Sequence, residues 1–411
     1  MKKAYIMLEI GIIGVGGGQM YTRNKVCFMR EKEWDVFVFS GLEGKVIISE
    51  LIDQIPFIIP ELISAPMVYS KKTIKEVINR VLTQVKGYDE YIIESGSAHL
   101  AYWGELLAER LRCKNMVHLL DERNDLLVPL DYLDFYKFKL ERRELSGIIK
   151  SSLPQLFRNA PFIKDNNSYY LSSVCQNVID EHIEESFSIP QCDFSLCCIG
   201  RLEKPYVSEV AKAFKQVVMN NREKSFAIVF IGDSINRANR DRIVDLLSIE
   251  RNVKLIMPGF VLPIPRSFFE KIDLFVSSAG SAGVSYRMNR PTISIDSEDL
   301  KAIGVMGYDT LNSIKRDNEP PQDIAQFIMK VLEGGYLNNF VYRPCSYEPN
   351  IGTLCSHLDF YNQSSKNLEY FPIKKLKPAG KDKKKYIIRK LLGKELYLLL
   401  RPFYSKLISK G

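Results

Sequence analysis

The feature that most constrains this chain is the alternation of short apolar runs with longer segments of helical pattern, which continues over most of its 411 residues. An apolar run bounded by glycine or polar turns predicts a buried strand, and apolar residues at three- and four-residue steps predict a helix. Strands that alternate with helices form mostly parallel sheets with helices on both faces. The sequence therefore predicts an α/β fold.

The alternation forms two series, and we expect each to fold as a doubly wound, Rossmann-like domain, because the chain is longer than one hydrophobic core usually serves. The first series contains the predicted strands Ala4–Val15, Trp34–Ser40, Glu90–Ile93, Asn115–Leu120 and Tyr169–Val178. The second contains Phe194–Ile199, Phe226–Gly232, Val253–Met257, Leu274–Ser277 and Thr292–Ile295. The predicted parts are an N-terminal domain (1–180), an acidic linker (181–193), a second domain (194–335), an irregular return segment (336–372) and a basic tail (373–411).

Positive charge is concentrated in the tail. Residues 373–411 hold 13 Lys and Arg and 2 Asp and Glu, so the rest of this +8 chain has a net charge of −3. A mildly acidic body argues against nucleic-acid binding. In the tail, apolar residues such as Ile387, Leu391 and Leu399 recur at helical steps among cations, which is typical of an amphipathic helix. We expect this helix to bind an anionic membrane surface, on the inner face of the plasma membrane; packing on the first domain is the alternative.

The cysteines and the N-terminus bear on the compartment. The eight cysteines form no C-x-x-C pair and no metal-ligand spacing, so we expect reduced thiols, a cytoplasmic protein and no metal site. The N-terminus is basic and then apolar, like a signal peptide, but Glu9 interrupts the apolar run and glycines follow. We therefore expect a first strand there. No uncharged apolar run reaches the roughly 18 residues that a spanning helix needs.

A glycine and two cations follow the first strand of the second series. Ile199 ends the strand, Gly200 permits a tight turn, and Arg201 and Lys204 come next. In open α/β sheets, ligands bind beyond the carboxyl ends of the strands. Because guanidinium and ammonium groups both suit phosphate, the turn predicts a pyrophosphate site, with ordinary surface cations as the alternative.

Five segments in this part of the chain resemble, in order, elements of glycosyltransferase family 4. They are Cys175–Asp180, Gly200–Lys204, Ile228–Asp233, Val253–Gly259 and Asp273–Ser278. The resemblance implies the GT-B architecture, in which two Rossmann-like domains face across a cleft. It also implies a retaining transferase with a nucleotide-sugar co-substrate, no further cofactor, and a lipid-linked or growing cell-surface polysaccharide as acceptor.

The resemblance further implies roles for individual residues. Arg201 and Lys204 would stabilise the charge that develops on the leaving diphosphate, without a metal. His118 would reach the donor sugar, although a histidine in an apolar strand is as readily a core residue. Met257 and Gly259 would lie near the nucleotide base.

The sequence departs from the family where two glutamates are usual, because no Asp or Glu lies between Asp273 and Asp296. Small residues at a predicted helix N-terminus occupy this place and still favour an anion, although close helix packing is the alternative. The candidate donor-site residues there are Gly280, Ser281, Gly283 and Ser285, the last as a ribose contact. The missing glutamates leave a non-catalytic binding or assembly protein as the alternative function.

The acceptor side is expected in loops of the first series. The glycine turn there does not fit a dinucleotide fingerprint, because Gln19 replaces the last glycine and no acid ends the second strand, which disfavours a hydride-transfer enzyme. A later loop mixes a carboxylate, hydroxyls and an imidazole, which suits sugar binding, with helix capping as the alternative for His99. The candidate acceptor-side residues are Gly16, Gly17, Gly18, Glu94, Ser97, His99 and Glu122.

Overall fold

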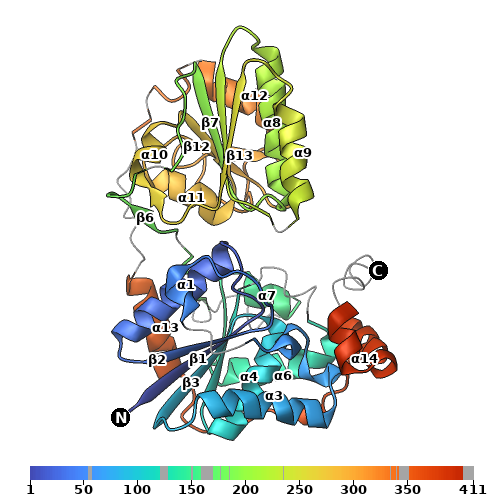
Figure 1. The fold of residues 1–411 in the computed structure, drawn as a ribbon. Helices are drawn as coiled ribbons and strands as arrows, with labels where there is room; N and C mark the ends of the chain where they lie inside the picture. The colour runs from blue at the N-terminus through green and yellow to red at the C-terminus, as the bar shows by residue number, and fades with distance from the viewer. Residues whose placement is uncertain are drawn as a thin grey trace. The chain divides into compact units, whose positions relative to one another are not determined.

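The computed structural model describes all residues except 54–57, 121–127, 150, 159–169, 176, 185, 235, 334, 339, 342–350 and 401–411. The chain forms two compact units (Figure 1). Unit 1 comprises Met1–Gly14, Tyr21–Val174 and Asn350–Gly411, and unit 2 comprises Val15–Met20 and Cys175–Pro349. The chain therefore returns to unit 1 after it has completed unit 2.

Unit 1 is built on a parallel sheet with the strand order β2-β1-β3-β4-β5. The strands are β1 (Lys3–Glu9), β2 (Asp35–Ser40), β3 (Glu90–Ser95), β4 (Lys114–Leu119) and β5 (Leu145–Gly147). Six of the seven residues of β1 are buried, as expected for a strand that lies inside a sheet covered on both faces. The carboxyl ends of β1 and β3 are neighbours at one edge of this sheet.

Helices of unit 1 follow its strands and also come from the C-terminal part of the chain. They are α1 (Gly17–Glu31), α2 (Ser49–Ile52), α3 (Lys71–Gln84), α4 (Ala98–Leu111), α6 (Leu133–Glu141), α7 (Ser152–Leu156), α13 (Ile351–Gln363) and α14 (Gly380–Leu392). The Ser70 side chain caps α3 by accepting a hydrogen bond from the Thr73 backbone N–H at 3.1 Å. Most of α4 is buried, and its Trp103 indole donates to the Ser64 carbonyl at 2.8 Å.

The C-terminal part of the chain differs from the sequence-based expectation. Irregular structure was expected over 336–372, yet Ile351–Gln363 forms α13, whose His357 and Tyr361 are buried against unit 1. In the tail, Ile373 and Tyr397 belong to the apolar core of unit 1. These contacts join segments far apart in sequence, so no local periodicity reveals them. The described part of the tail therefore packs on unit 1, which was the alternative to membrane binding.

Unit 2 contains a six-stranded sheet with the order β13-β12-β11-β7-β8-β9, parallel except for β13. Its strands are β7 (Phe194–Ile199), β8 (Phe226–Ile231), β9 (Val253–Gly259), β11 (Leu274–Ser277), β12 (Thr292–Ile295) and β13 (Ala302–Val305). A separate parallel pair joins β6 (Ile179–Asp180) to β10 (Ile264–Pro265). The helices are α8 (Pro205–Asn220), α9 (Arg237–Leu247), α10 (Arg266–Glu270), α11 (Ala279–Arg287) and α12 (Ile324–Glu333).

Alternate residues of β7 face opposite layers of unit 2. Leu196 and Cys198 pack in one apolar cluster with α8 and α12, whereas Cys197 and Ile199 pack in another with α10 and α11. This two-residue period is the signature of a strand covered on both faces, and it confirms the predicted α/β fold class. All four of these side chains are almost completely buried.

Two predicted strands are shorter or absent. The first was predicted over Ala4–Val15 and ends at Glu9, the last of its residues that pairs with β2. Of the described residues in Tyr169–Val178, only Tyr170 pairs, in an isolated bridge to Gly147.

None of the described helices combines the length and the apolar character that a membrane-spanning segment needs.

Candidate functional site

Three glycines bring the loops of neighbouring strands together at the carboxyl edge of the unit 2 sheet. A Cβ on Gly200 would collide with the Tyr206 hydroxyl, and one on Gly232, whose φ is +140°, would collide with the Gly200 carbonyl. The Gly200 N–H donates to the Ile231 carbonyl at 2.9 Å, and the Gly232 N–H donates to the Gly259 carbonyl at 2.9 Å. Glycine is therefore required here for close backbone approach.

The predicted cations lie on the turn that leads into α8. Arg201 is 36% exposed and pairs with Glu203 at 3.4 Å, and Lys204 is the exposed N-cap residue of α8. Pro205 opens the helix, where a missing N–H removes no helical hydrogen bond. Two cations and a helix N-terminus thus share one edge of the sheet, which is an arrangement that favours an anion.

The N-terminus of α11 lies beside this turn. β11 and β7 are adjacent strands, so the residues that follow them are neighbours. Burial raises the pKa of Tyr206, and a hydrogen bond from the Ser281 side chain acts in the opposite direction. The Tyr206 hydroxyl also donates to the Ile199 carbonyl at 3.0 Å. The structure therefore brings together the Gly200–Lys204 turn and the predicted small-residue helix end.

Several predicted donor-site residues are already engaged within unit 2. Ser285 is fully buried, and its hydroxyl accepts from Thr292 Oγ1 at 2.9 Å and donates to the Ala282 carbonyl at 3.2 Å. This places Ser285 in the contact between α11 and β12, with its hydroxyl engaged inside unit 2. The Met257 carbonyl accepts from Arg240 Nη2 at 2.8 Å. Gly259 has a φ of +86° and lies beside Asp233.

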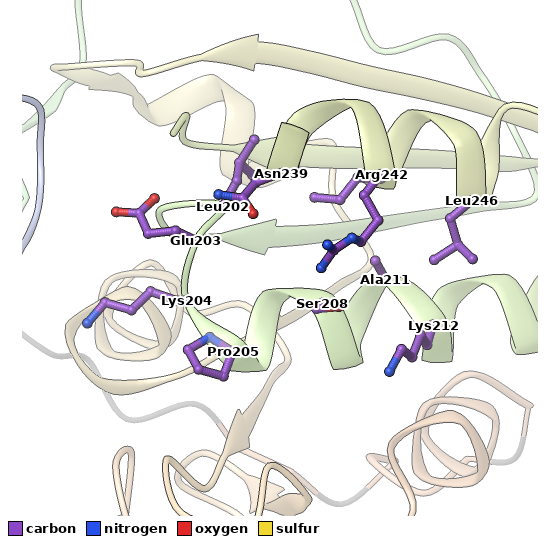
Figure 2. A pocket seen from close by; sticks show the side chains of 11 residues that line it. Leu202, Glu203, Lys204, Pro205, Ser208, Ala211, Lys212, Asn239, Arg242 and Leu246 are labelled. Atoms are coloured by element: carbon purple, nitrogen blue, oxygen red, sulfur yellow. The ribbon is translucent and has the colours of Figure 1, made fainter. Parts of the chain in front are cut away.

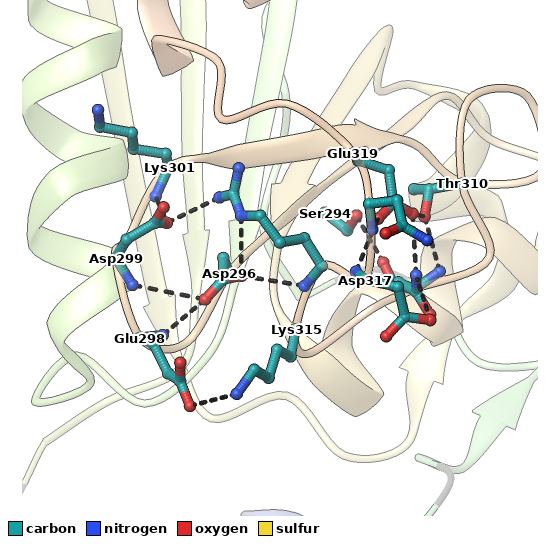
Figure 3. A network of polar contacts seen from close by, with 12 residues as sticks. Ser294, Asp296, Glu298, Asp299, Lys301, Thr310, Lys315, Asp317 and Glu319 are labelled. Atoms are coloured by element: carbon teal, nitrogen blue, oxygen red, sulfur yellow. Dashed lines mark hydrogen bonds and ion pairs between the residues drawn. The ribbon is translucent and has the colours of Figure 1, made fainter.

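Sequence reasoning missed a loop that closes over the α11 N-terminus. The Ala279 N–H donates to the Ser313 carbonyl at 2.6 Å, so the first helical N–H is not available to a ligand. A polar network holds the loop (Figure 3). Asp296, which directly follows β12, accepts hydrogen bonds from Arg316 Nε at 3.1 Å and from the Glu298 N–H at 2.8 Å. Its only sequence signal is an aspartate that follows a strand end and precedes further polar residues.

The hydrogen bonds to Asp296 favour the ionised form of its carboxyl group. Burial opposes ionisation, but N–H groups of Arg316, Glu298 and Asp299 and the Arg316 side chain together lower its pKa below the usual value. Arg316 also pairs with Asp299 at 2.7 Å. The network fixes the loop that supplies the Ser313 carbonyl.

A hollow of about 180 Å³ lies between the N-terminal half of α8 and helix α9 (Figure 2). Its lining includes Leu202, Lys204, Ser208, Asn239, Arg242 and Leu246. Ligand pockets usually have volumes of roughly 300–1,000 Å³, so this hollow is too small for a nucleotide sugar. It adjoins the predicted site only through the Leu202–Lys204 turn, and we assign it no ligand.

Two of the predicted residues of unit 1, Glu94 and His118, are buried. Glu94 is 1% exposed and accepts hydrogen bonds from the hydroxyls of Tyr5, Tyr21 and Tyr361. His118 is fully buried, with Nδ1 2.9 Å from Ser146 Oγ, and burial lowers its pKa to about 4. Neither side chain reaches the surface of unit 1, so His118 fits the core-residue alternative.

The remaining acceptor-side predictions fall in three places. Gly16–Gly18 precede and begin α1, in the segment that groups with unit 2. Ser97 Oγ and His99 Nδ1 lie 3.4 Å apart at the start of α4. Glu122 lies outside the described residues. Among the residues described, no three His, Cys, Asp or Glu side chains form a group that fits a metal ion.

Solved structures share this architecture at low sequence identity. A glycosyltransferase from Rickettsia africae ESF-5 has a TM-score of 0.58 and 13% identity, covering 96% of this chain and 100% of its own. The chain has the GT-B fold. No protein-family model matches the sequence, and no curated protein does.

Other GT-B neighbours differ in their activities. A Staphylococcus aureus TarM variant, solved with UDP, has a TM-score of 0.51 and 9% identity, covering 88% of this chain and all of its own. A putative UDP-N-acetylglucosamine 2-epimerase from Listeria monocytogenes has a TM-score of 0.51 and 11% identity, covering 87% and 95%. Because both transferases and epimerases are similar to this chain, the likeness establishes the GT-B fold and not the reaction.

Proposed function

We propose that this protein is a glycosyltransferase whose unit 2 holds the donor, a nucleoside diphosphate sugar, and that the sugar is transferred from this donor. The observation that carries the proposal is the pairing of two helix N-termini, α8 and α11, on the adjacent strands β7 and β11. Arg201 and Lys204 add positive charge to one of them. A diphosphate would bind between fixed N–H donors and cations, which are most effective where charge develops on a leaving group.

The finer features of the proposal follow from the resemblance to glycosyltransferase family 4. We propose transfer with retention, to a lipid-linked or growing polysaccharide acceptor. Gly280, Ser281 and Gly283 would contact the diphosphate, while Met257 and Gly259 would lie near the base. UDP is the first nucleotide to test, because GT-B neighbours were solved with UDP.

Calorimetric titration with UDP, GDP and CMP sugars tests donor binding. We expect one nucleotide class to bind, and we expect Arg201→Ala with Lys204→Ala to weaken its affinity roughly 10- to 100-fold, the usual effect of losing charged hydrogen bonds to phosphate. Lys212→Ala is the matched control, because Lys212 lies on the same helix α8, is exposed and pairs with Glu209. Wild-type protein that binds none of these donors would refute the proposal.

Transfer assays separate an enzyme from the alternative, a non-catalytic binding protein. The alternative gains support from unit 2, where no carboxylate lies between Asp273 and Asp296. If the protein is an enzyme, incubating it with the nucleotide sugar that it binds and a membrane extract should release free nucleoside diphosphate. Tight donor binding without release would favour the binding protein.

We also propose that the tail binds an anionic membrane surface. Leu391 is 79% exposed and Leu399 is 70% exposed, and the same part of the chain carries exposed cations such as Lys384 and Lys390. Exposed apolar side chains surrounded by lysines are suited to lipid headgroups. The inner face of the plasma membrane is the expected location.

Point substitution tests the membrane better than truncation, because Tyr397 is part of the unit 1 core and its removal would damage the fold. Leu391→Ser with Leu399→Ser should abolish flotation with phosphatidylglycerol vesicles. Leu311→Ser is the control, since Leu311 is 78% exposed on unit 2. Unchanged flotation of the double variant would exclude these side chains from membrane binding.

A further inference from the structure

Two glutamates at neighbouring strand ends of unit 1 have opposite environments. Glu94, at the end of β3, has the Lys25 ammonium 3.4 Å away and three tyrosine hydroxyls as donors. Although burial opposes its ionisation, Lys25, His118 and the hydroxyls of Tyr21 and Tyr361 lower its pKa to about 2. Glu94 is therefore a permanently charged structural group.

Glu9, the last residue of β1, lacks such partners. In the described structure its carboxyl group accepts one hydrogen bond, from Thr22 Oγ1, 3.1 Å from Oε1, and no Lys, Arg or His of the described residues forms an ion pair with it. Burial raises its pKa to about 8, and the nearby charge of Glu94 acts in the same direction. At neutral pH this carboxyl group is therefore protonated, so it both donates and accepts hydrogen bonds.

The position of Glu9 is that of a ligand group. It ends an inner strand at the carboxyl edge of a parallel sheet, where α/β proteins bind ligands. It keeps 9% exposure, whereas Glu94 keeps 1%. Gly96, directly after β3, lies beside this carboxyl group: a Cβ there would be 3.5 and 3.7 Å from its two oxygens, an ordinary contact distance.

A carboxyl group held neutral by burial disfavours folding, because the unfolded chain ionises it freely. Pairs of carboxyl groups whose environments drive their pKa values apart are typical of functional sites. Glu94 has an evident structural role in binding Lys25 and the tyrosines. Glu9 has no equivalent role among the residues of unit 1 that the structure describes.

We propose that Glu9 binds a hydroxyl group of the sugar acceptor. The proposal rests on the proposed function, and it replaces the buried Glu94 as the acceptor-side carboxyl group. A neutral carboxylic acid and a sugar hydroxyl each donate one hydrogen bond and accept another, so the pair is complementary. Among the described residues, the titratable groups that face Glu9 are Glu94 from β3 and Tyr21 from α1, and neither supplies positive charge.

Direct binding of alkyl glycosides tests this without any nucleotide. The probes are octyl glycosides of glucose, galactose, mannose and N-acetylglucosamine, below their micelle concentrations, with the dissociation constant measured by ligand-observed NMR. We expect at least one to bind the full-length protein at pH 7. Glu9→Ala should weaken that binding roughly 10-fold, and Glu9→Gln, which resembles the neutral acid, should stay within about threefold of wild type.

A pH series separates ligand contact from a structural effect. Wild-type affinity should be constant to about pH 8 and fall above it, as Glu9 ionises and loses its donor, whereas Glu9→Gln should show no such fall. Glu43→Ala, at an exposed glutamate of unit 1, is the control. The proposal is overturned if no glycoside binds wild type or if Glu9→Ala binds normally. Loss of donor binding alone would refute the proposed function and leave this measurement intact.

Discussion

Replacing Glu9 with glutamine should stabilise unit 1, by an amount that depends on pH. The folded carboxyl group has a pKa of about 8, against 4.5 for the ordinary side chain. Between these values the folded unit binds one proton more than the unfolded chain. The free energy of unfolding of wild type therefore falls as the pH rises through this window.

The magnitude follows from the width of the window. Each pH unit between 4.5 and 8 lowers the free energy of unfolding by about 1.4 kcal/mol, which gives about 3 kcal/mol at pH 7 and about 5 kcal/mol above pH 8. Glutamine does not ionise, and its Oε1 keeps the hydrogen bond from Thr22 Oγ1. The variant should therefore equal wild type near pH 4.5 and exceed it increasingly up to pH 8.

Urea unfolding followed by tryptophan fluorescence measures this quantity for unit 1 alone. The only two tryptophans, Trp34 and Trp103, lie in unit 1 and are buried. Glu43→Gln, at an exposed position, should leave the midpoint and its pH dependence unchanged. If Glu9→Gln and wild type unfold at the same urea concentration from pH 5 to pH 8, Glu9 is not held neutral by the fold, and the reasoning fails.

Three further predictions concern the same two units. Lys25→Met should destabilise unit 1 by roughly 3–5 kcal/mol, because it leaves Glu94 buried without a cation, and the tryptophan signal should report it. Glu94→Gln should reduce the dependence of the free energy of unfolding on pH in acid. The depressed pKa of Glu94 contributes stability above about pH 4.5, and wild type loses this stability as the pH falls towards 2. A wild-type protein that keeps its stability over this range would contradict the assignment. Gly232→Ala should destabilise unit 2 by about 2 kcal/mol or more and abolish donor binding. The tryptophan-monitored unfolding of unit 1 should be unchanged. Normal UDP affinity in this variant would show that the Gly232 loop is not part of the donor site.

Much of the fold was predictable because local patterns determine it. The predicted strand Phe194–Ile199 coincides with β7, and Asn115–Leu120 differs from β4 by one residue at each end. Apolar runs of this kind are stable only when both faces are covered, which requires helices on either side. The Gly200 turn was likewise visible as a strand end followed by glycine and two cations, although that pattern alone left ordinary surface cations as the alternative.

The site was less predictable, because burial and charge depend on residues that are distant in sequence. Ser285 was a candidate ribose contact from the sequence, and in the structure its hydroxyl accepts a hydrogen bond from Thr292 Oγ1. The loop that closes over α11 depends on Asp296 and Arg316, twenty residues apart. No local pattern reports either contact.

The sequence by itself determined the strands, the glycine turns and the concentration of positive charge in the tail, because each depends on residue types at short spacing. Only the tertiary structure decided which of two glutamates is a charged structural group. Tyr361 reaches Glu94 across 267 residues of sequence, from a helix that had been expected to be irregular. Lys25 completes that environment, and within the described ranges no cation pairs with Glu9. A carboxyl group responds to the electrostatics of everything packed around it, and that packing exists only in the folded chain.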